Sequence, residues 1–228
     1  VISKLFDQNM LPAIYFIFSR KGCDRALENI NHLTLVNYKE ANLISQRLKQ
    51  YSKYNQEGIK DNVHFEALKK GIASHHAGLL PAWKELVEEL FQQGLIKVVF
   101  ATETLAAGIN MPARTTVISS LSKRSENGHR LLFSSEFLQM SGRAGRRGKD
   151  TQGYVVTVQN RFEGAKEASA LAISEPNPLI SQFTPSYGMV LNLLQNYSIE
   201  KSRELIQRSF GSFVYLEESV KENLSITH

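Results

Sequence analysis

The sequence has only one cysteine, Cys23, in 228 residues. A single thiol excludes a disulfide within the chain and a zinc site built from several cysteines. No apolar run approaches the ~20 residues that a membrane-spanning helix needs, and the first ten residues lack the basic and then apolar layout of a signal peptide. We therefore expect an intracellular protein without a membrane anchor.

Two motifs of nucleotide chemistry are also missing. The sequence contains no G-x-x-x-x-G-K-[S/T] segment, which excludes a phosphate-cradling P-loop, and no Asp-Glu pair follows a predicted strand to hold Mg²⁺. The adjacent His75 and His76 could bind a metal, but neighbouring side chains point apart in a strand or a helix, and no further ligands accompany them. We expect no metal site. A hydrogen bond to a ligand or to the core is the favoured role for these histidines.

The composition is ordinary for a soluble globular protein, with 42% hydrophobic and 21% charged residues. Lys and Arg number 27 against 22 Asp and Glu, and the resulting net charge of +5 permits a nucleic-acid partner without requiring one. The length corresponds to one domain and part of a second, because domains average about 150 residues. Such a chain buries a sizeable core without disulfides or metals.

Apolar runs and helical periods alternate along most of the chain. Residues 13–18 form a continuous apolar run, which is typical of a strand buried on both faces. Further strands are predicted at residues 95–101, 115–119 and 153–158, and residues 71–77 are either a short strand or a loop. Helices are predicted at residues 23–33, 38–56, 62–70, 81–93 and 134–141. This alternation predicts a parallel α/β sheet.

The composition changes at residues 174–185, where three prolines fall within a short stretch and mark a linker. We assign residues 1–173 to the α/β domain. No strand pattern follows the linker, so residues 186–228 are predicted to begin a helical domain that is cut short.

The most informative segment is QMSGRAGRRG at residues 139–148, with three arginines and three glycines. Glycines let a bound group approach the backbone closely. Arg143 and Arg146 are three residues apart, so they would share one face if the preceding helix continued through them. Paired guanidinium groups suit bidentate contacts with phosphate oxygens. Alternatively, the segment is a basic surface turn or a patch for an RNA backbone.

A second segment, ATETLAAGINMP at residues 101–112, directly follows a predicted strand. Ligands of parallel α/β sheets bind beyond the carboxyl ends of the strands, which is where Thr102 and Thr104 fall. Gly108 and Asn110 belong to a tight turn with an exposed amide. The competing interpretation is purely structural: a helix N-cap at Thr102 followed by that turn.

Together, in this order and spacing, these segments resemble the second RecA-like motor domain of superfamily 2 helicases of the DExH, superkiller-like group. FIFSRKGCD at 16–24 resembles motif IV, and GIASHHAGLLP at 71–81 resembles the next block of that group. ATETLAAGINMPAR at 101–114 resembles motif V, and QMSGRAGRRG resembles motif VI. The likeness covers about residues 11–160 and is nearest to the cyanobacterial and chloroplast branch of these RNA helicases. The segment after the linker resembles the start of the winged-helix domain that follows the motor.

The resemblance implies a RecA-like parallel sheet sandwiched by helices, followed by a partial winged-helix domain. It implies that ATP and Mg²⁺ are bound mainly by a first motor domain outside this chain, so the chain alone is expected to be inactive as an ATPase. Its contribution to hydrolysis would be two arginine fingers, Arg143 and Arg146. The residues implied to lie toward the nucleotide are Gln139, Gly108 and Asn110. The residues implied to contact a nucleic-acid strand are Arg20, His76, Gly78, Thr102 and Thr104.

The expected partners are single-stranded RNA, or DNA as a second option, and the first RecA-like domain of the same polypeptide. The expected compartment is the cytoplasm, or the chloroplast stroma for a plant protein. Two alternatives keep part of this chemistry: the same motor domain in a DNA-repair helicase, and a non-catalytic module that binds nucleic acid. A flavodoxin-like regulatory domain would fit the sheet but would leave the two arginines without a purpose. The role of the predicted helix at 38–56 is left open.

Overall fold

The computed structural model describes residues 1–54, 62–125, 128–177 and 186–209. The chain divides into two compact units, Val1–Pro176 and Asn177–His228. Most of the predicted linker, residues 178–185, lies outside the described residues, as do residues 210–228 of the predicted helical domain.

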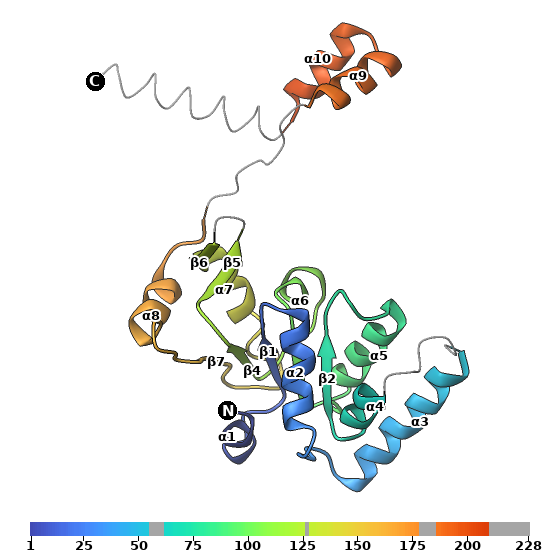
Figure 1. The fold of residues 1–228 in the computed structure, drawn as a ribbon, viewed down its shortest axis with the longest axis vertical. Coiled ribbons are helices and arrows are strands. Elements are labelled where there is room, and N and C mark those ends of the chain that lie inside the picture. The colour runs from blue at the N-terminus through green and yellow to red at the C-terminus, as the bar shows by residue number, and fades with distance from the viewer. Residues whose placement is uncertain (55–61, 126–127, 178–185, 210–228) are drawn as a thin grey trace. The chain divides into compact units, whose positions relative to one another are not determined.

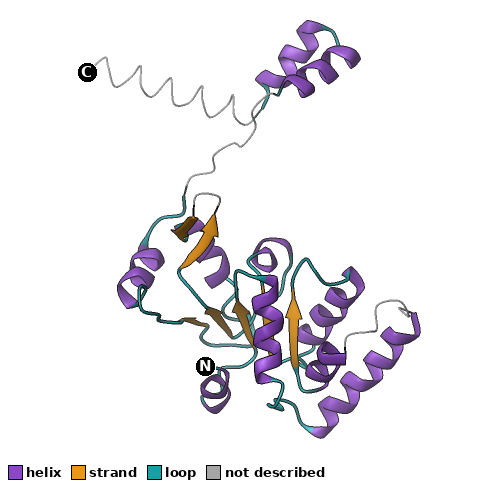
Figure 2. Cartoon of the chain, in the orientation of Figure 1, coloured by secondary structure: helices purple, strands orange, loops and turns teal. Residues whose placement is uncertain are grey.

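The first unit is built on a five-stranded parallel sheet with the order β2-β3-β1-β4-β7 (Figures 1 and 2). The strands are β1 (Ala13–Phe16), β2 (Ile72–His75), β3 (Val98–Ala101), β4 (Thr115–Ile118) and β7 (Tyr154–Thr157). All four residues of β2, β3 and β4 are buried. Burial on both faces is typical of the unbroken apolar run of β3, whereas β2 and β4 also bury polar residues such as Ser74 and Thr115. The predicted α/β fold with a parallel sheet is confirmed.

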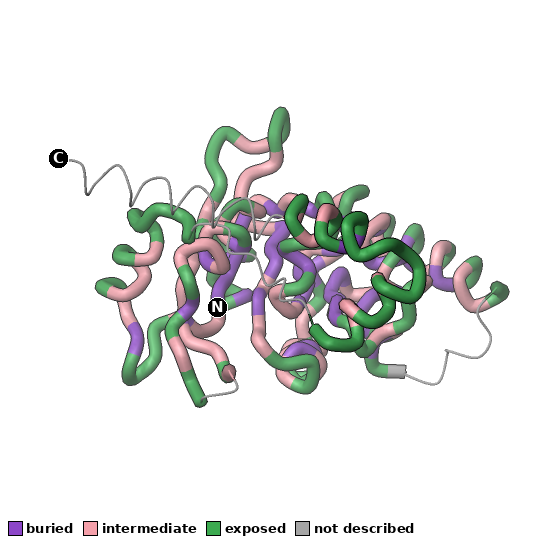
Figure 3. Tube along the Cα trace, turned by 90° about the horizontal axis from the view of Figure 1, so that it is seen from above, coloured by how far each residue is buried: buried purple, intermediate pink, exposed green. Residues whose placement is uncertain are grey.

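Helices cover both faces of this sheet and form two apolar cores. One core contains α1 (Ile2–Asp7) and α2 (Arg20–Ile30) packed on the side chains of Ala13 and Phe100. The other contains α3 (Tyr38–Tyr54), α5 (Pro81–Gln92), α6 (Thr104–Gly108) and α7 (Ser134–Ser141), packed on the side chains of Ile14 and Val99. The short helix α4 (Asn62–Lys69) contributes Ala67 to one core and Leu68 to the other. Buried residues therefore follow the strands and the inner sides of the helices (Figure 3).

Four elements of the first unit have no counterpart in the sequence-based prediction. They are α1, α8 (Ala165–Ile173) and a two-stranded antiparallel hairpin of β5 (Ser122–Ser125) and β6 (Gly128–Leu131). The hairpin strands are four residues long and mostly polar, so they carry no apolar period. The signal available for this hairpin was the Asn127-Gly128 dipeptide, a common hairpin turn sequence.

The second unit contributes two described helices, α9 (Tyr187–Asn196) and α10 (Ile199–Gln207). Each begins after a serine whose hydroxyl accepts a hydrogen bond from the first turn: Ser186 from the backbone N–H of Met189, and Ser198 from that of Lys201. These caps explain where the helices start. None of the helices in the described ranges combines the length and apolarity needed to span a membrane.

Candidate functional site

The five residues predicted to contact nucleic acid gather at one edge of the sheet. Because the strands are parallel, their carboxyl ends share that edge, which is where ligands of such sheets bind. Arg20 opens α2 after β1, and His76 and Gly78 follow β2. Thr102 and Thr104 follow β3, which lies between β1 and β2. The topology therefore brings three separate sequence segments to one place.

Arg20, His76 and Gly78 lie against one another. A Cβ atom at Gly78 would lie 3.1 Å from His76 Nδ1 and 3.5 Å from Arg20 Cδ. The Gly78 N–H donates to Nδ1 of His76 at 3.1 Å, so the ring proton must sit on Nε2, 2.9 Å from the Asp24 carboxylate. His76 is 4% exposed and both ring nitrogens are occupied. Its side chain therefore fixes the loop, while the exposed Arg20 side chain is the group presented to solvent.

Thr102 and Thr104 are joined through their hydroxyl groups, whose oxygens are 2.9 Å apart. Thr104 begins the short helix α6 and is exposed, as is Gly108 at its end. A Cβ atom at Gly108 would meet nothing within 4 Å, so the surface there is open to an approaching group. Asn110 is also exposed. Its backbone carbonyl oxygen accepts a hydrogen bond of 3.5 Å from the side-chain nitrogen of Gln92 in α5.

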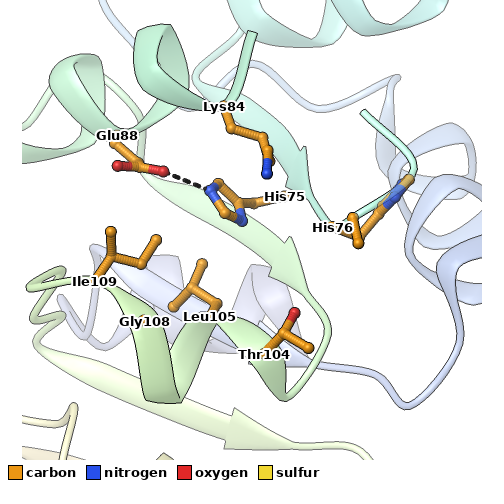
Figure 4. Close-up of a pocket in the computed structure, with 9 residues that line it drawn as sticks. His75, His76, Lys84, Glu88, Thr104, Leu105, Gly108 and Ile109 are labelled. Carbon is orange, nitrogen blue, oxygen red and sulfur yellow. Dashed lines mark hydrogen bonds and ion pairs between the residues drawn. The ribbon is translucent and has the colours of Figure 1, made fainter. Parts of the chain in front are cut away.

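A cavity of about 290 Å³ lies between α5 and α6 at this edge (Figure 4). Its lining residues are His75, His76, Ala77, Lys84, Glu88, Thr104, Leu105, Gly108 and Ile109. His75, which the sequence did not single out for this site, points toward Glu88 across the cavity wall, with Nε2 2.7 Å from a carboxylate oxygen. Burial lowers the pKa of His75, and the Glu88 contact only partly opposes this. Among the described residues, no group of three or more His, Cys, Asp or Glu side chains could hold a metal ion.

The helix predicted at residues 134–141 is confirmed as α7, and it does not continue through the two arginines. The helix ends at Ser141, and Ala144 forms a parallel bridge with Ala113 before β4. Gly145 then adopts a φ of 90°, which favours glycine. A Cβ atom at Gly153 would lie 2.6 Å from Gly145 N, so two glycines allow the turn to pack against the start of β7. Tertiary contact with two strands stops the helix at this point.

Arg143 and Arg146 consequently have different partners inside the protein. The Arg143 guanidinium donates through Nε (3.1 Å) and Nη2 to the carbonyl oxygen of Ala106 in α6. Arg146 pairs with Asp150 through Nε (2.7 Å) and Nη2 (2.8 Å), and its backbone N–H donates to the same carboxylate at 3.0 Å. These hydrogen bonds raise the pKa of Arg146 and lower the pKa of Asp150. Gln139 is exposed on α7, one turn before this segment.

An ion-pair network that sequence reasoning missed surrounds the start of α7. Lys123 Nζ lies 2.6 Å from Glu103 and 2.7 Å from Glu136, and Arg130 donates two hydrogen bonds to Glu136. Arg130 also stacks on the Phe133 ring at 4.0 Å. Burial alone would raise the pKa of Glu136, but hydrogen bonds from Arg130, Lys123 and the Phe133 N–H lower it to about 2. Glu136 is therefore ionised at any ordinary pH.

Comparison with known proteins identifies the family of this chain. Residues 9–148 match the family described as the helicase conserved C-terminal domain. The chain belongs to that family. The match contains all the predicted site residues, from Arg20 to Arg146. The family predicted from the four motifs is thereby confirmed.

Several relatives of this helicase domain are longer proteins. The chain is 48% identical, over 92% of its length, to the chloroplastic DExH-box ATP-dependent RNA helicase DExH15 of Arabidopsis thaliana, and it covers 20% of that protein. It is 41% identical over 93% of its length to the probable helicase HelY of Mycobacterium tuberculosis, covering 24% of it. It is 38% identical over 100% of its length to the antiviral helicase SKI2 of Saccharomyces cerevisiae, covering 18% of it. The chain thus spans about a fifth of the length of the curated relatives it matches.

Proposed function

We propose that this chain is the second motor domain of an ATP-dependent DExH RNA helicase. The observation that carries the proposal is the pair of motif VI arginines, held in a turn that packs on α6, the helix of motif V. The contact of Arg143 with α6 supports a phosphate-binding role for motif VI close to motif V. The name of the Arabidopsis relative, a DExH-box ATP-dependent RNA helicase, supports RNA as the substrate.

The role proposed for Arg143 and Arg146 is to stabilise negative charge on the transferred phosphoryl group of ATP. An arginine finger contributes about 10³–10⁵ in rate, which corresponds to about 4–7 kcal/mol of transition-state stabilisation. Gln139, Gly108 and Asn110 are proposed to face the nucleotide, and all three are exposed. ATP and Mg²⁺ are proposed to be held mainly by a first motor domain, as the resemblance to superfamily 2 helicases implies, and this sequence has no P-loop segment of its own.

The edge that carries Arg20, Thr102 and Thr104 is proposed to bind the backbone of a single nucleic-acid strand. An exposed guanidinium and exposed or half-buried hydroxyls suit phosphate and sugar oxygens. Gly78 is proposed to let the strand approach the backbone closely. Both ring nitrogens of His76 are occupied, so His76 is proposed to position the Gly78 loop rather than to contact the strand. Such contacts position a strand without reading its sequence.

Residues 1–173 are proposed to form the motor domain, and residues 186–228 to begin the winged-helix domain that follows it. The compartment proposed is the cytoplasm, or the chloroplast stroma if the protein comes from a plant, as the name of the chloroplastic relative supports. No contact with a membrane is proposed.

The deciding experiment measures RNA-stimulated ATP hydrolysis by the full-length polypeptide that carries this chain. Arg146→Ala should lower turnover by three or more decades while RNA binding is kept. The matched control is Arg147→Ala, which removes an exposed neighbouring arginine of the same motif. Near-normal turnover of Arg146→Ala would make motif VI a basic contact surface and would contradict the arginine-finger role. Comparing RNA with DNA as the stimulating strand separates the RNA helicase from a DNA-repair motor.

A further inference from the structure

Lys123 bridges two segments to which the proposed function gives different tasks. Its Nζ lies 2.6 Å from Glu103, which stands between Thr102 and Thr104 in the loop after β3. The same atom lies 2.7 Å from Glu136, in the first turn of α7. The Lys123 side chain is only 15% exposed, so one partly buried ammonium group holds both carboxylates.

Glu136 is fixed from a second side as well. Arg130 donates to both of its carboxylate oxygens, at 2.9 and 2.7 Å, and the Phe133 N–H donates to one of them at 2.8 Å. Lys123 and Arg130 are paired residues on the two strands of the β5–β6 hairpin. The hairpin is therefore bound to the start of α7 by two cations, Lys123 and Arg130, which both contact the Glu136 carboxylate. A network of this kind opposes the displacement of any one of its three side chains.

The other end of α7 carries the nucleotide-facing residues. The helix is only eight residues long, from Ser134 to Ser141, and leads directly into the turn with Arg143 and Arg146. Arg143 then returns to the carbonyl oxygen of Ala106 in α6. A displacement of the loop after β3 can thus reach motif VI at two points, through α6 and through the Lys123 bridge.

We propose that the Glu103–Lys123–Glu136 bridge couples strand binding at the Thr102–Thr104 loop to the placement of the motif VI arginines. The proposal rests on the proposed function. Glu103, Lys123 and Glu136 are positioning residues in it, since none is required to touch nucleotide or strand. A contiguous charged contact between two functional segments is a physical route for coupling, and its demonstration requires a measured coupling energy.

A purely structural bridge would behave differently from a coupling bridge. A structural role predicts that breaking the bridge lowers stability and lowers hydrolysis with and without RNA alike. A coupling role predicts that RNA still binds and that unstimulated hydrolysis persists, while the stimulation by RNA is lost. The ratio of the two hydrolysis rates distinguishes them.

The test uses the full-length polypeptide with Glu103→Gln, Lys123→Met, and both changes together. Glu103 is 41% exposed on its side chain, so its substitution breaks one arm with little risk to folding. We expect each single variant to lower the ratio of RNA-saturated to unstimulated hydrolysis at least fivefold, with the dissociation constant for RNA changed less than threefold. The double variant should lose no more than Lys123→Met alone, because that change already removes the contact with Glu103. Lys69→Met, which breaks the exposed pair with Glu66 on α4, is the control and should keep the full ratio.

Three outcomes would overturn the bridge. The single variants could keep the wild-type ratio, their effects could multiply in the double variant, or hydrolysis with and without RNA could fall together with the melting temperature. A wild-type protein whose hydrolysis ignores RNA would overturn the proposed function and the bridge with it. An RNA-responsive wild type with equally responsive variants would overturn the bridge alone.

Discussion

Removing Arg146 should destabilise the α/β unit more than neutralising its partner Asp150. The Asp150 side chain is 3% exposed and accepts three hydrogen bonds from Arg146, whereas the Arg146 side chain is 24% exposed. Without Asp150 the guanidinium can reach water. Without Arg146 the carboxylate stays buried with only the backbone N–H of residue 146 as a donor, and a buried charge that loses its partner is costly.

The expected magnitudes follow from that asymmetry. Breaking a fully buried pair costs about 3–5 kcal/mol, and partial exposure of Arg146 reduces this to about 2–4 kcal/mol for Arg146→Ala. Asp150→Asn keeps the shape and part of the hydrogen bonding, so we expect about 1–2 kcal/mol, as for the loss of one charged hydrogen bond. The double variant should be more stable than Arg146→Ala alone, because it no longer buries an unpaired charge.

Urea unfolding of the 228-residue chain, followed by circular dichroism, measures these differences as shifts of the midpoint. A double variant that unfolds at the same urea concentration as Arg146→Ala, or below it, would refute the reasoning. The double variant also makes the hydrolysis experiment cleaner. It should regain stability without regaining turnover, since the finger is still absent.

The pH dependence gives an independent check of the same pair. The hydrogen bonds from Arg146 lower the pKa of Asp150 in the folded protein. The folded state therefore binds this proton less readily than the unfolded state does, and the pair contributes fully above the ordinary carboxyl pKa. That contribution is lost as the pH falls through the lowered folded pKa. The Asp150→Asn variant should lose less stability than the wild type over this acid range.

Three further predictions concern other parts of the unit. Gly153→Ala should cost about 1–3 kcal/mol by overpacking, since the new methyl would lie 2.6 Å from the backbone N of Gly145; an unchanged melting temperature would show that the turn can shift. Glu163→Ala should cost about 1–3 kcal/mol, because the Leu121 N–H and the Ser120 hydroxyl would lose their acceptor; denaturant unfolding measures this, and a neutral effect would mean that water replaces the carboxylate. RNA binding by the full-length polypeptide should weaken steeply with salt and vary little with sequence; filter binding at several salt concentrations would contradict this if affinity followed sequence instead.

Most of the sheet could be predicted because its strands are local signals. The run at Val98–Ala101 is fully buried and apolar, so its own sequence is enough to predict a strand without knowing which strands lie beside it. Helix α5 could also be predicted from its own sequence, because Pro81 lies in its first turn and Gly94 lies just beyond its end. The candidate site could be placed without knowing the order of the strands. The carboxyl ends of parallel strands lie at one edge of the sheet whatever that order is.

The candidate site was predictable by residue identity but not by geometry. Spacing would put Arg143 and Arg146 on one helix face only if α7 continued through them, and the helix ends at Ser141. The break depends on the bridge of Ala144 to Ala113, a partner 31 positions away in the chain. The roles of Lys123 and Glu136 were equally invisible, since a mostly polar hairpin has no apolar period and an ion pair across segments leaves no local pattern.

The internal partners of the motif VI arginines predict weak nucleotide binding by the chain alone. Arg146 already has a carboxylate and Arg143 a carbonyl oxygen, so a phosphate would replace satisfied hydrogen bonds rather than fill empty ones. Little net free energy remains for association, and we expect a dissociation constant for ATP weaker than about 1 mM, or less than about 4 kcal/mol of binding. Asp150→Asn should tighten binding, because it frees the guanidinium from a competing anion. Calorimetric titration of the wild-type chain that gave micromolar affinity would show that the arginines are open to phosphate before a second motor domain arrives.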